Sequence, residues 1–328
     1  MIQTRPRIIL SASRRTDIPA FYLPWFMQQL DKGCFDIINP FNRQVKRVPA
    51  LPRDIYAIVF WSKNYGPFLS ANAGEALIKK GFRLYFNFTL NSASPLLEPG
   101  VPPLPERLEQ MTQLATRFGA DKIAWRFDPV CRFQNPDTPG IQDNLSDFPT
   151  IAGTAGRMGV KKCVSSFMDH YPKINRRLKH LADEHHIHLA FEKLDLSQKK
   201  DIISTLLEQL EPLGIVLHLC CEKEVLNAMK LDAIESDPLE SGILGPGTDF
   251  PTQIRPNACI DGHELFRLFG GEPPELRRDY GQRSKQGCLC TRALDVGSYQ
   301  DHPCRHNCLY CYANPGASFQ PGSIGERQ

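Results

Sequence analysis

The stretch that decides the fold runs from Asp54 to Leu90 and reads DIYAIVFW, SKNYGPFLSANAGEALIKKG and FRLYFNFTL. After Asp54, residues 55–61 form a continuous apolar run, which is typical of a strand buried on both faces. A helical pattern follows from Pro67 to Lys80 and ends at Gly81, because glycine commonly ends helices. The third part alternates strongly from Phe82 to Leu90. A strand, a crossover helix and a second strand predict a parallel α/β fold.

The same alternation continues along the rest of the chain. Eight strands are expected, most of them separated by a helix, and eight are what a TIM-like barrel of parallel strands requires. The predicted strands are 7–10, 54–61, 82–90, 122–127, 160–166, 187–191, 214–219 and 293–296. We expect residues 1–225 to form the barrel body, and residues 226–328 to be a cysteine-rich segment that completes the barrel.

Composition sets limits on the class of protein. The chain has 328 residues, of which 41% are hydrophobic and 23% charged, and its net charge is +3. This near balance gives no strong signal for nucleic-acid binding. No apolar run approaches the roughly 18–20 residues that a membrane-spanning helix needs, and no signal-peptide pattern is visible at the N-terminus. We therefore expect a cytoplasmic protein, in which the 11 cysteines indicate metal or redox chemistry more than disulfides.

Three of these cysteines lie close together near the C-terminal end of the chain. Cys304, Cys308 and Cys311 have the spacing C-x3-C-x2-C, and thiolates are soft ligands. Three thiolates on one loop can hold three corners of a cuboidal 4Fe–4S cluster and leave one iron open to a small molecule. A zinc knuckle, a purely structural cluster and unligated thiols are the alternatives.

Four further cysteines are candidates for a second, closed metal site. They are Cys220, Cys259, Cys288 and Cys290, which could supply four thiolates to an iron–sulfur cluster or to a zinc ion. Separate buried thiols would be the structural alternative. The remaining thiols, interpreted as ordinary buried side chains, are Cys34, Cys131, Cys163 and Cys221.

The triplet, with Tyr310 just before its last cysteine, resembles the cluster loop of radical S-adenosylmethionine (SAM) enzymes. Over nearly its whole length the chain resembles an uncharacterised bacterial domain-of-unknown-function family with a C-terminal radical-SAM-like cysteine cluster. That resemblance rests on SxSRRTD at 11–17, NPFN at 39–42, WxKN at 61–64, RFDP at 126–129, CxC at 288–290, DVGxY at 295–299 and CxxxCxYCYAN at 304–314.

The resemblance implies a radical-SAM-like iron–sulfur enzyme with one or two 4Fe–4S clusters and S-adenosylmethionine as cofactors. The open iron would bind the amino and carboxylate groups of SAM. An electron from a cellular reductant such as flavodoxin or ferredoxin would then cleave SAM, and the resulting radical would take hydrogen from an unknown small-molecule or nucleobase-type substrate. A barrel metal hydrolase with a structural zinc–cysteine site is one alternative. A non-enzymatic iron–sulfur or nucleic-acid-binding protein is the other.

The position of the triplet differs from the radical SAM pattern, in which the cysteine loop follows the first strand. Here it lies near the other end of the chain. If residues 293–296 lie beside residues 8–10, the loop occupies the usual place in space, and the chain is a circular permutation of a radical SAM barrel.

Polar residues at the ends of the predicted strands complete the expected site, because barrel chemistry takes place at the carboxyl ends of the strands. Arginine offers a fork to a carboxylate, and acidic side chains accept hydrogen bonds from ribose hydroxyls. The expected catalytic residues are Arg14, Asp17, Lys63, Arg126, Asp128 and Glu192. The expected cofactor-binding residues are Arg15, Asn64, Asn87, Ser165 and Glu222.

Overall fold

Eight parallel strands form one large sheet in the computed structural model, which describes residues 6–38, 44–136, 138–236, 253–281 and 283–313. The order across the sheet is β12-β11-β9-β6-β5-β4-β1-β13. The strands are β1 (Ile8–Ala12), β4 (Ile55–Ser62), β5 (Leu84–Thr89), β6 (Ile123–Val130), β9 (Lys162–Phe167), β11 (Val216–Leu219), β12 (Ile254–Pro256) and β13 (Leu294–Asp295). The predicted parallel α/β fold is confirmed.

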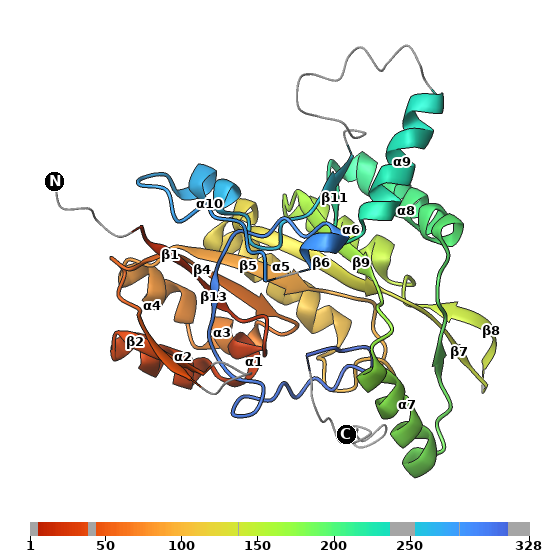
Figure 1. Ribbon diagram of the computed structural model, residues 1–328, viewed down its shortest axis with the longest axis horizontal. Helices are drawn as coiled ribbons and strands as arrows, with labels where there is room; N and C mark the ends of the chain where they lie inside the picture. The colour runs from red at the N-terminus through yellow and green to blue at the C-terminus, as the bar shows by residue number, and fades with distance from the viewer. Residues whose placement is uncertain (1–5, 39–43, 137, 237–252, 282, 314–328) are drawn as a thin grey trace.

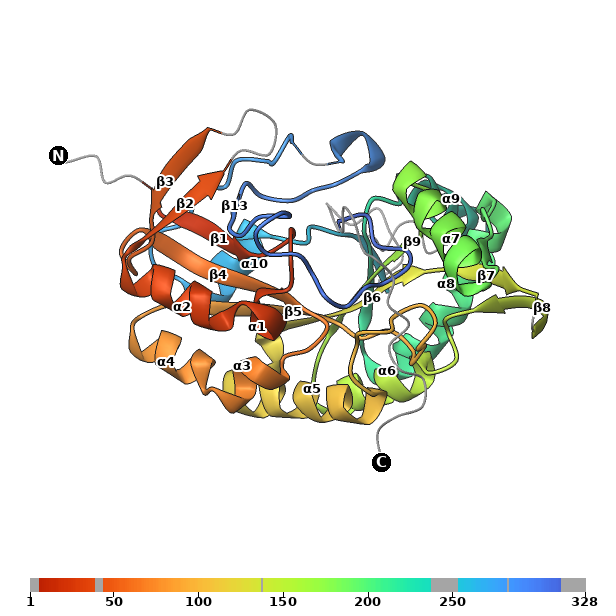
Figure 2. The same cartoon turned by 90° about the horizontal axis from the view of Figure 1, so that it is seen from below.

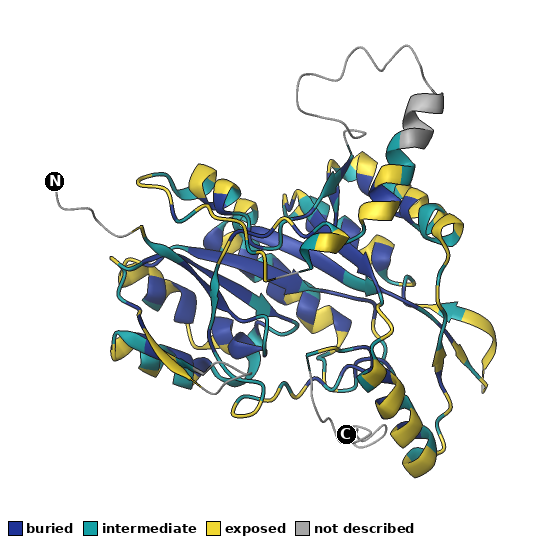
Figure 3. Ribbon diagram, in the orientation of Figure 1, coloured by how far each residue is buried: buried dark blue, intermediate teal, exposed yellow. Residues whose placement is uncertain are grey.

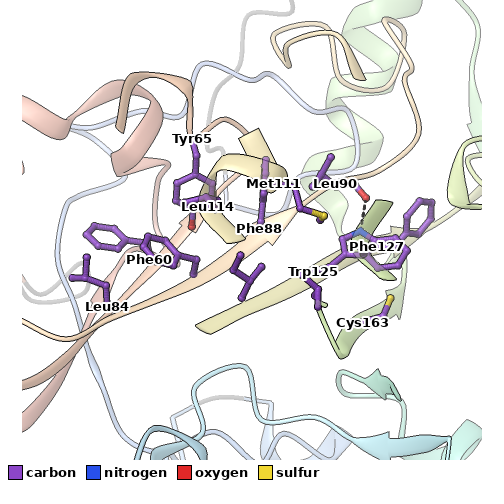
Figure 4. Close-up of a cluster of buried hydrophobic side chains, with 14 of the residues drawn as sticks. Phe60, Tyr65, Leu84, Phe88, Leu90, Met111, Leu114, Trp125, Phe127 and Cys163 are labelled. Carbon is purple, nitrogen blue, oxygen red and sulfur yellow. Dashed lines mark hydrogen bonds between the residues drawn. The ribbon is translucent and has the colours of Figure 1, made fainter. Parts of the chain in front are cut away.

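Most helices pack against one face of this sheet (Figures 1 and 2). They are α1 (Ile18–Phe21), α2 (Leu23–Asp31), α3 (Gly66–Ser70), α4 (Ala73–Lys79), α5 (Leu104–Phe118), α6 (Phe148–Arg157), α8 (Leu196–Leu210) and α9 (Lys223–Ser236). Short 3₁₀ turns lie at Ala120–Lys122, Glu211–Leu213 and Ser284–Gln286. The helix-covered face holds the larger hydrophobic core, in which Phe60, Phe86 and Trp125 are buried. Figure 4 shows part of it, with the Trp125 indole donating to the carbonyl oxygen of Leu90 at 3.0 Å.

The opposite face of the sheet is covered by α10 (Gly262–Phe269) and the segment that follows it. Leu265 of α10 belongs to a second buried cluster together with Ile9, Tyr56 and Val59 of the strands. Strand residues are therefore buried on both faces, as Figure 3 shows for the centre of the sheet. This explains why β4 is apolar along its whole length rather than at alternate positions.

Aspartate side chains cap the N-termini of two helices. Asp17 caps α1 by accepting from the backbone N–H of Ala20, and Asp261 caps α10 in the same way. Helix α10 ends at Gly270, whose φ of +60° suits glycine. The stretch Gly270-Gly271-Glu272 therefore begins at the C-terminal cap of α10.

Two smaller antiparallel sheets flank the main one. The hairpin of β2 (Cys34–Ile38) and β3 (Val45–Pro49) occupies the segment in which the sequence indicates an excursion. The other sheet joins β10 (Ala190–Phe191), β7 (Arg132–Asn135) and β8 (Thr138–Asp143). It lies next to α7 (Pro172–His185), whose outer face is exposed (Figure 3).

Two expectations about the strands need correction. The segment 187–191 is not a strand of the main sheet, because Ala190 and Phe191 pair antiparallel with β7. The strands expected on its two sides, β9 and β11, pair directly with each other, and the three-residue strand β12 lies beyond β11 as an unpredicted strand of the sheet. Barrel closure is not observed among the described residues, since β12 and β13 form the two edges of an open sheet.

The predicted position of the last strand is confirmed. Strand β13 pairs parallel with β1, with Leu294 opposite Leu10 and Asp295 opposite Ser11. The segment before the cysteine triplet therefore lies beside the first strand, as the circular permutation requires. Within the described part of the chain, the helices include none with the length and apolar character needed to cross a membrane.

Candidate functional site

A cavity of about 270 Å³ opens at the carboxyl ends of the central strands. Cysteines of both predicted groups line it, together with charged and aromatic side chains. The lining residues used below are Ser13, Arg14, Trp61, Lys63, Arg126, Asp128, Ser166, Tyr171, Cys220, Cys221, Cys259, Arg283, Cys288, Cys290, Tyr310, Cys311 and Tyr312. The sheet thus brings together residues that are nearly 300 positions apart in the chain.

A buried arginine of α7 binds the backbone of the cysteine loop, residues 304–311. Arg177 donates to the carbonyl oxygens of Cys308 at 3.0 Å, Leu309 at 2.6 Å and Cys311 at 3.2 Å. Because one guanidinium binds three carbonyl groups of the loop, the backbone of the loop turns tightly around it. In the same turn the N–H of Cys311 donates to the carbonyl of Cys308 at 3.1 Å. The loop conformation is therefore fixed by the chain itself.

A second attachment joins the loop to the end of β1. The imidazole of His306, in the middle of the triplet, contacts Asp17 Oδ2 at 2.8 Å and the carbonyl of Gly100 at 3.0 Å. Asp17 also accepts from the hydroxyl of Ser62 and from the backbone N–H of Lys63, both at 2.8 Å. Asp17, expected to be catalytic, is thus buried and fully engaged in positioning the loop.

A buried polar network forms the third attachment. Lys63 Nζ lies 2.9 Å from Glu98 Oε1 and 3.1 Å from the hydroxyl of Tyr310. Asn91 donates to the same two partners. Burial lowers the pKa of Lys63, but the Glu98 carboxylate and the charge of Cys308 together outweigh burial, and the net pKa is raised. Burial raises the pKa of Glu98, yet its cationic neighbours, Lys63 first, leave that pKa below its ordinary value.

The three thiols of the triplet are close enough to interact electrostatically. Burial raises the pKa of the Cys308 thiol, and negative charge on Cys311 and Cys304 raises it further. Burial likewise raises the pKa of Cys304 to about 12. Lys63 opposes this by favouring the Cys308 thiolate. The donor set therefore fits an electron-deficient metal group, which would compensate the buried thiolate of Cys308 and the half-buried thiolates of Cys304 and Cys311.

The second group of cysteines forms a ring of five thiols rather than four. Cys220 Sγ lies 3.3 Å from Cys259 Sγ and 3.8 Å from Cys221 Sγ. Cys259 also interacts with Cys290, and Cys288 interacts with both Cys290 and Cys221. The thiol ring thus consists of Cys220, Cys259, Cys290, Cys288 and Cys221, and all five line the cavity.

Neither the triplet nor the thiol ring surrounds a position for a single metal ion. Across the described ranges, no group of three or more His, Cys, Asp or Glu side chains is arranged to hold one metal ion. A cuboidal cluster has a different requirement, because each of its cysteines binds a different iron.

Charged residues at the end of β6 reach the thiol ring. Arg126 donates to Cys259 Sγ at 3.3 Å and forms an ion pair with Asp128. Hydrogen bonds from Cys220 and Cys290, together with Arg126, lower the pKa of Cys259 well below its ordinary value. Asp128 in turn accepts from the hydroxyl of Ser166. Arg126 and Asp128, both predicted, therefore lie at the centre of the cavity wall.

Arg14, also predicted, connects the end of β1 to the edge strand β13. Its guanidinium lies 2.7 Å from Asp295 of β13 and 3.4 Å from Asp279. These neighbours raise the pKa of Arg14 even though burial opposes the charge. The side chain lines the cavity while it joins β1 to β13.

Besides Asp17, six of the predicted catalytic and cofactor-binding residues lie outside the cavity wall. Glu192 pairs with Arg132 in the small sheet, 3.4 Å away, and Glu222 pairs with Lys199 of α8 at 3.0 Å. Each of the other four hydrogen-bonds locally: Arg15 with Gly297, Asn64 with Gln110, Asn87 with the carbonyl of Cys259, and Ser165 with Phe127. We therefore interpret these contacts as structural.

The sequence reasoning missed several residues of the site. Asn257 follows the unpredicted strand β12 and donates to Cys259 Sγ at 3.0 Å. Cys221 lies in the bend after β11, has a φ of +63°, and places its thiol in the ring. Asn257 could have been found from the sequence, because it lies two residues before Cys259, a candidate ligand. The φ of Cys221 has no sequence signature.

Comparisons with known proteins give little beyond the family. No curated protein matches the chain. Among solved structures, a crystal structure of D-hydantoinase is 10% identical with a TM-score of 0.29, over 56% of this chain and 37% of that one. A D-hydantoinase from a Bacillus sp. AR9 gives 10% identity and the same TM-score over 57% and 38%. The chain thus spans less than two fifths of these proteins, and the likeness is too low to carry an argument.

The family comparison covers almost the entire chain. A family model described as "Domain of unknown function (DUF1848)" matches residues 9–313, a range that includes the eight strands of the sheet, both groups of cysteines and the cavity between them. The protein therefore belongs to this uncharacterised domain family.

Proposed function

We propose that this protein is a radical-SAM-like iron–sulfur enzyme in which Cys304, Cys308 and Cys311 hold a 4Fe–4S cluster. The observation that carries the proposal is the placement of the triplet. Three interacting thiols on one firmly attached loop lie at the carboxyl ends of a parallel sheet, and the third of them lines a polar cavity. Three ligands leave one iron free for a small molecule that enters from that cavity.

A cluster of this kind, once bound and reduced, supplies one electron that breaks the sulfonium C–S bond of SAM, giving methionine and a carbon radical that takes one hydrogen atom from the substrate. The electron comes from a cellular reductant such as flavodoxin or ferredoxin. The chain itself supplies charge balance, orientation and protection from water.

Charge balance comes from Lys63. Its ammonium group favours the buried Cys308 thiolate, while its contacts with Glu98 and Tyr310 keep it in place. Orientation of the ligand falls to the cavity wall. Asp128 can accept hydrogen bonds from ribose hydroxyls, and Ser166 and Ser13 offer further hydroxyl groups. Trp61 and Tyr312 on the same wall provide apolar surface that excludes water.

Anaerobic reconstitution with iron and sulfide tests this function. We expect wild-type protein, reduced with dithionite, to convert SAM to 5′-deoxyadenosine and methionine. The triple variant Cys304→Ala, Cys308→Ala, Cys311→Ala is expected to lose this conversion completely. Cys34→Ser, which alters a thiol of the β2 hairpin outside both groups, should retain it.

Two results would overturn the proposal. Colourless protein with stoichiometric zinc would favour a hydrolase with a structural zinc site. A brown protein that leaves SAM intact after reduction would favour a non-enzymatic iron–sulfur protein.

A further inference from the structure

We propose that four of the five thiols in the ring of Cys220, Cys221, Cys259, Cys288 and Cys290 bind a second iron–sulfur cluster, which faces the same cavity as the triplet. The inference goes beyond the proposed function, because it stands on a different group of residues. Five cysteines from three separate places in the sequence meet at one end of the sheet. No disulfide joins any of them.

The origin of the five thiols argues against a chance contact. Cys220 and Cys221 follow β11, Cys259 follows β12, and Cys288 and Cys290 precede β13. They therefore join the two edges of the open sheet, where no strand pairing connects β12 with β13. A group bound by these thiols would link the edges through its bonds, as structural metal sites do in small domains.

The backbone at Cys221 gives independent support. Cys220 and Cys221 lie in the bend that directly follows β11. The φ of +63° at Cys221 brings both thiols into the ring, 3.8 Å apart. Residues other than glycine rarely adopt this conformation, and where they do the site is commonly functional.

The surroundings of Cys259 favour a cluster over zinc. Its sulfur accepts N–H donors from Arg126 at 3.3 Å and from Asn257 at 3.0 Å. Hydrogen bonds to cysteine sulfur are a principal means of tuning the reduction potential of iron–sulfur clusters. Arg283 adds a second cation near Cys221 and Cys220. A redox-inert ion would have no use for such tuning.

The arrangement of the ring shows what loading a cluster would require. The described thiols do not converge on one ion position, but a cluster binds each cysteine through a different iron. Loading must still move Cys220 away from a neighbour, because its contacts with Cys221 and Cys259 are close. Five thiols allow this, since four suffice.

The test measures iron in protein that lacks the triplet. Cys304→Ala, Cys308→Ala, Cys311→Ala protein is reconstituted anaerobically, and iron and acid-labile sulfide are counted. We expect about four irons per chain, as a Cys₄-ligated 4Fe–4S cluster requires, and an electron paramagnetic resonance signal after reduction. Adding Cys259→Ser together with Cys290→Ser, which leaves three thiols in the ring, should reduce the iron several-fold and abolish that signal, whereas adding Cys163→Ser, a buried thiol of β9 outside the ring, should leave both unchanged.

The outcomes separate this inference from the proposed function. Absence of iron from the triplet-free protein, or stoichiometric zinc in its place, would overturn the second cluster even if the wild type cleaves SAM. Equal iron in wild-type and triplet-free protein would support the second cluster and overturn the first. Circular dichroism of the variant that also lacks Cys259 and Cys290 checks that loss of iron does not reflect unfolding.

Discussion

The buried pair of Lys63 and Glu98 shows how a single interaction serves the cysteine loop. Both side chains are almost inaccessible, with 15% and 3% exposed, and Tyr310 of the loop hydrogen-bonds to both. Removing one partner of a buried ion pair leaves an uncompensated charge, which is strongly destabilising. The pair therefore ties loop stability to protonation.

The variant Glu98→Gln tests this through its pH dependence. The folded-state pKa of Glu98 is lowered, so its contribution is present above the unfolded pKa of about 4.3 and is lost as the pH falls. The folded-state pKa of Lys63 is raised, so its contribution is present below about pH 10.4 and is lost at higher pH. Between these limits we expect Glu98→Gln to lower the free energy of unfolding by about 3 kcal/mol.

Urea unfolding of the apoprotein from pH 3 to pH 9 measures this difference. It should shrink towards acid pH, where Glu98 of the wild type becomes protonated as well. Glu75→Gln is the matched control, since Glu75 pairs with Arg117 at the surface and such pairs contribute less than about 1 kcal/mol. A difference that does not vary with pH would contradict the assignment.

Residue identity could be predicted better than residue role. Asp17, Lys63, Arg126 and Asp128 were found because polar residues follow buried strands, and all four lie at the expected end of the sheet. Their partners could not be found, because His306 and Tyr310 are more than 200 positions distant from them or from Glu98. Sequence shows that a strand ends in a charge, but only the fold shows what neutralises it.

At the scale of elements, the loop before α5 and the cysteine loop touch through their backbones. Gly100 donates to the carbonyl oxygen of His306 at 3.0 Å, and Leu309 donates to that of Leu97 at 2.9 Å. A Cβ atom at position 100 would lie 2.4 Å from the carbonyl oxygen of Arg305 and 2.9 Å from His306 Cα. Only glycine permits this approach.

We expect Gly100→Ala to destabilise the protein by about 1–3 kcal/mol, because the clash is with backbone atoms that cannot move aside cheaply. The control Gly153→Ala lies in α6, where the nearest heavy atom to a new Cβ is a mobile Arg157 nitrogen at 3.5 Å. Alanine in a helix is favourable by roughly 0.5–1 kcal/mol. Thermal unfolding should therefore move in opposite directions for the two variants, and equal melting temperatures would refute the contact.

Long elements were predictable and short ones were not. The helix expected at 67–80 is divided into α3 and α4, with Asn72 at a φ of +48° between them. Strand β12 has only three residues, too few for a periodic pattern to be recognised. The strand at 187–191 has apolar residues that fit any sheet, and its partner β7 decided which one it joined.

For the whole molecule, the C-terminal third completes the sheet rather than forming a separate unit. Strand β13 lies at one edge, β12 at the other, and α10 covers the face between them. Without these elements Ile9, Tyr56, Tyr85 and Val164 would lose their cover. The same segment carries the cysteines, so fold and site depend on one stretch of chain.

A chain ending at residue 225 is therefore expected to be insoluble or to lack fixed tertiary structure, because a contiguous apolar face would be open to water. A chain ending at residue 313 retains every described element and should remain folded. Soluble yield and near-ultraviolet circular dichroism compare the two. A well-folded 225-residue fragment would show that the N-terminal part is a domain of its own.

The pairing of Leu10 with Leu294 also has a consequence in time. A ribosome adding roughly 5–20 residues per second needs on the order of 15–60 s to travel between these two positions. Throughout that interval the outer edge of β1 has no partner, and an open edge can recruit strands from other nascent chains. A protein built this way should depend on chaperones during synthesis, at the very strand to which its cysteine loop is later attached.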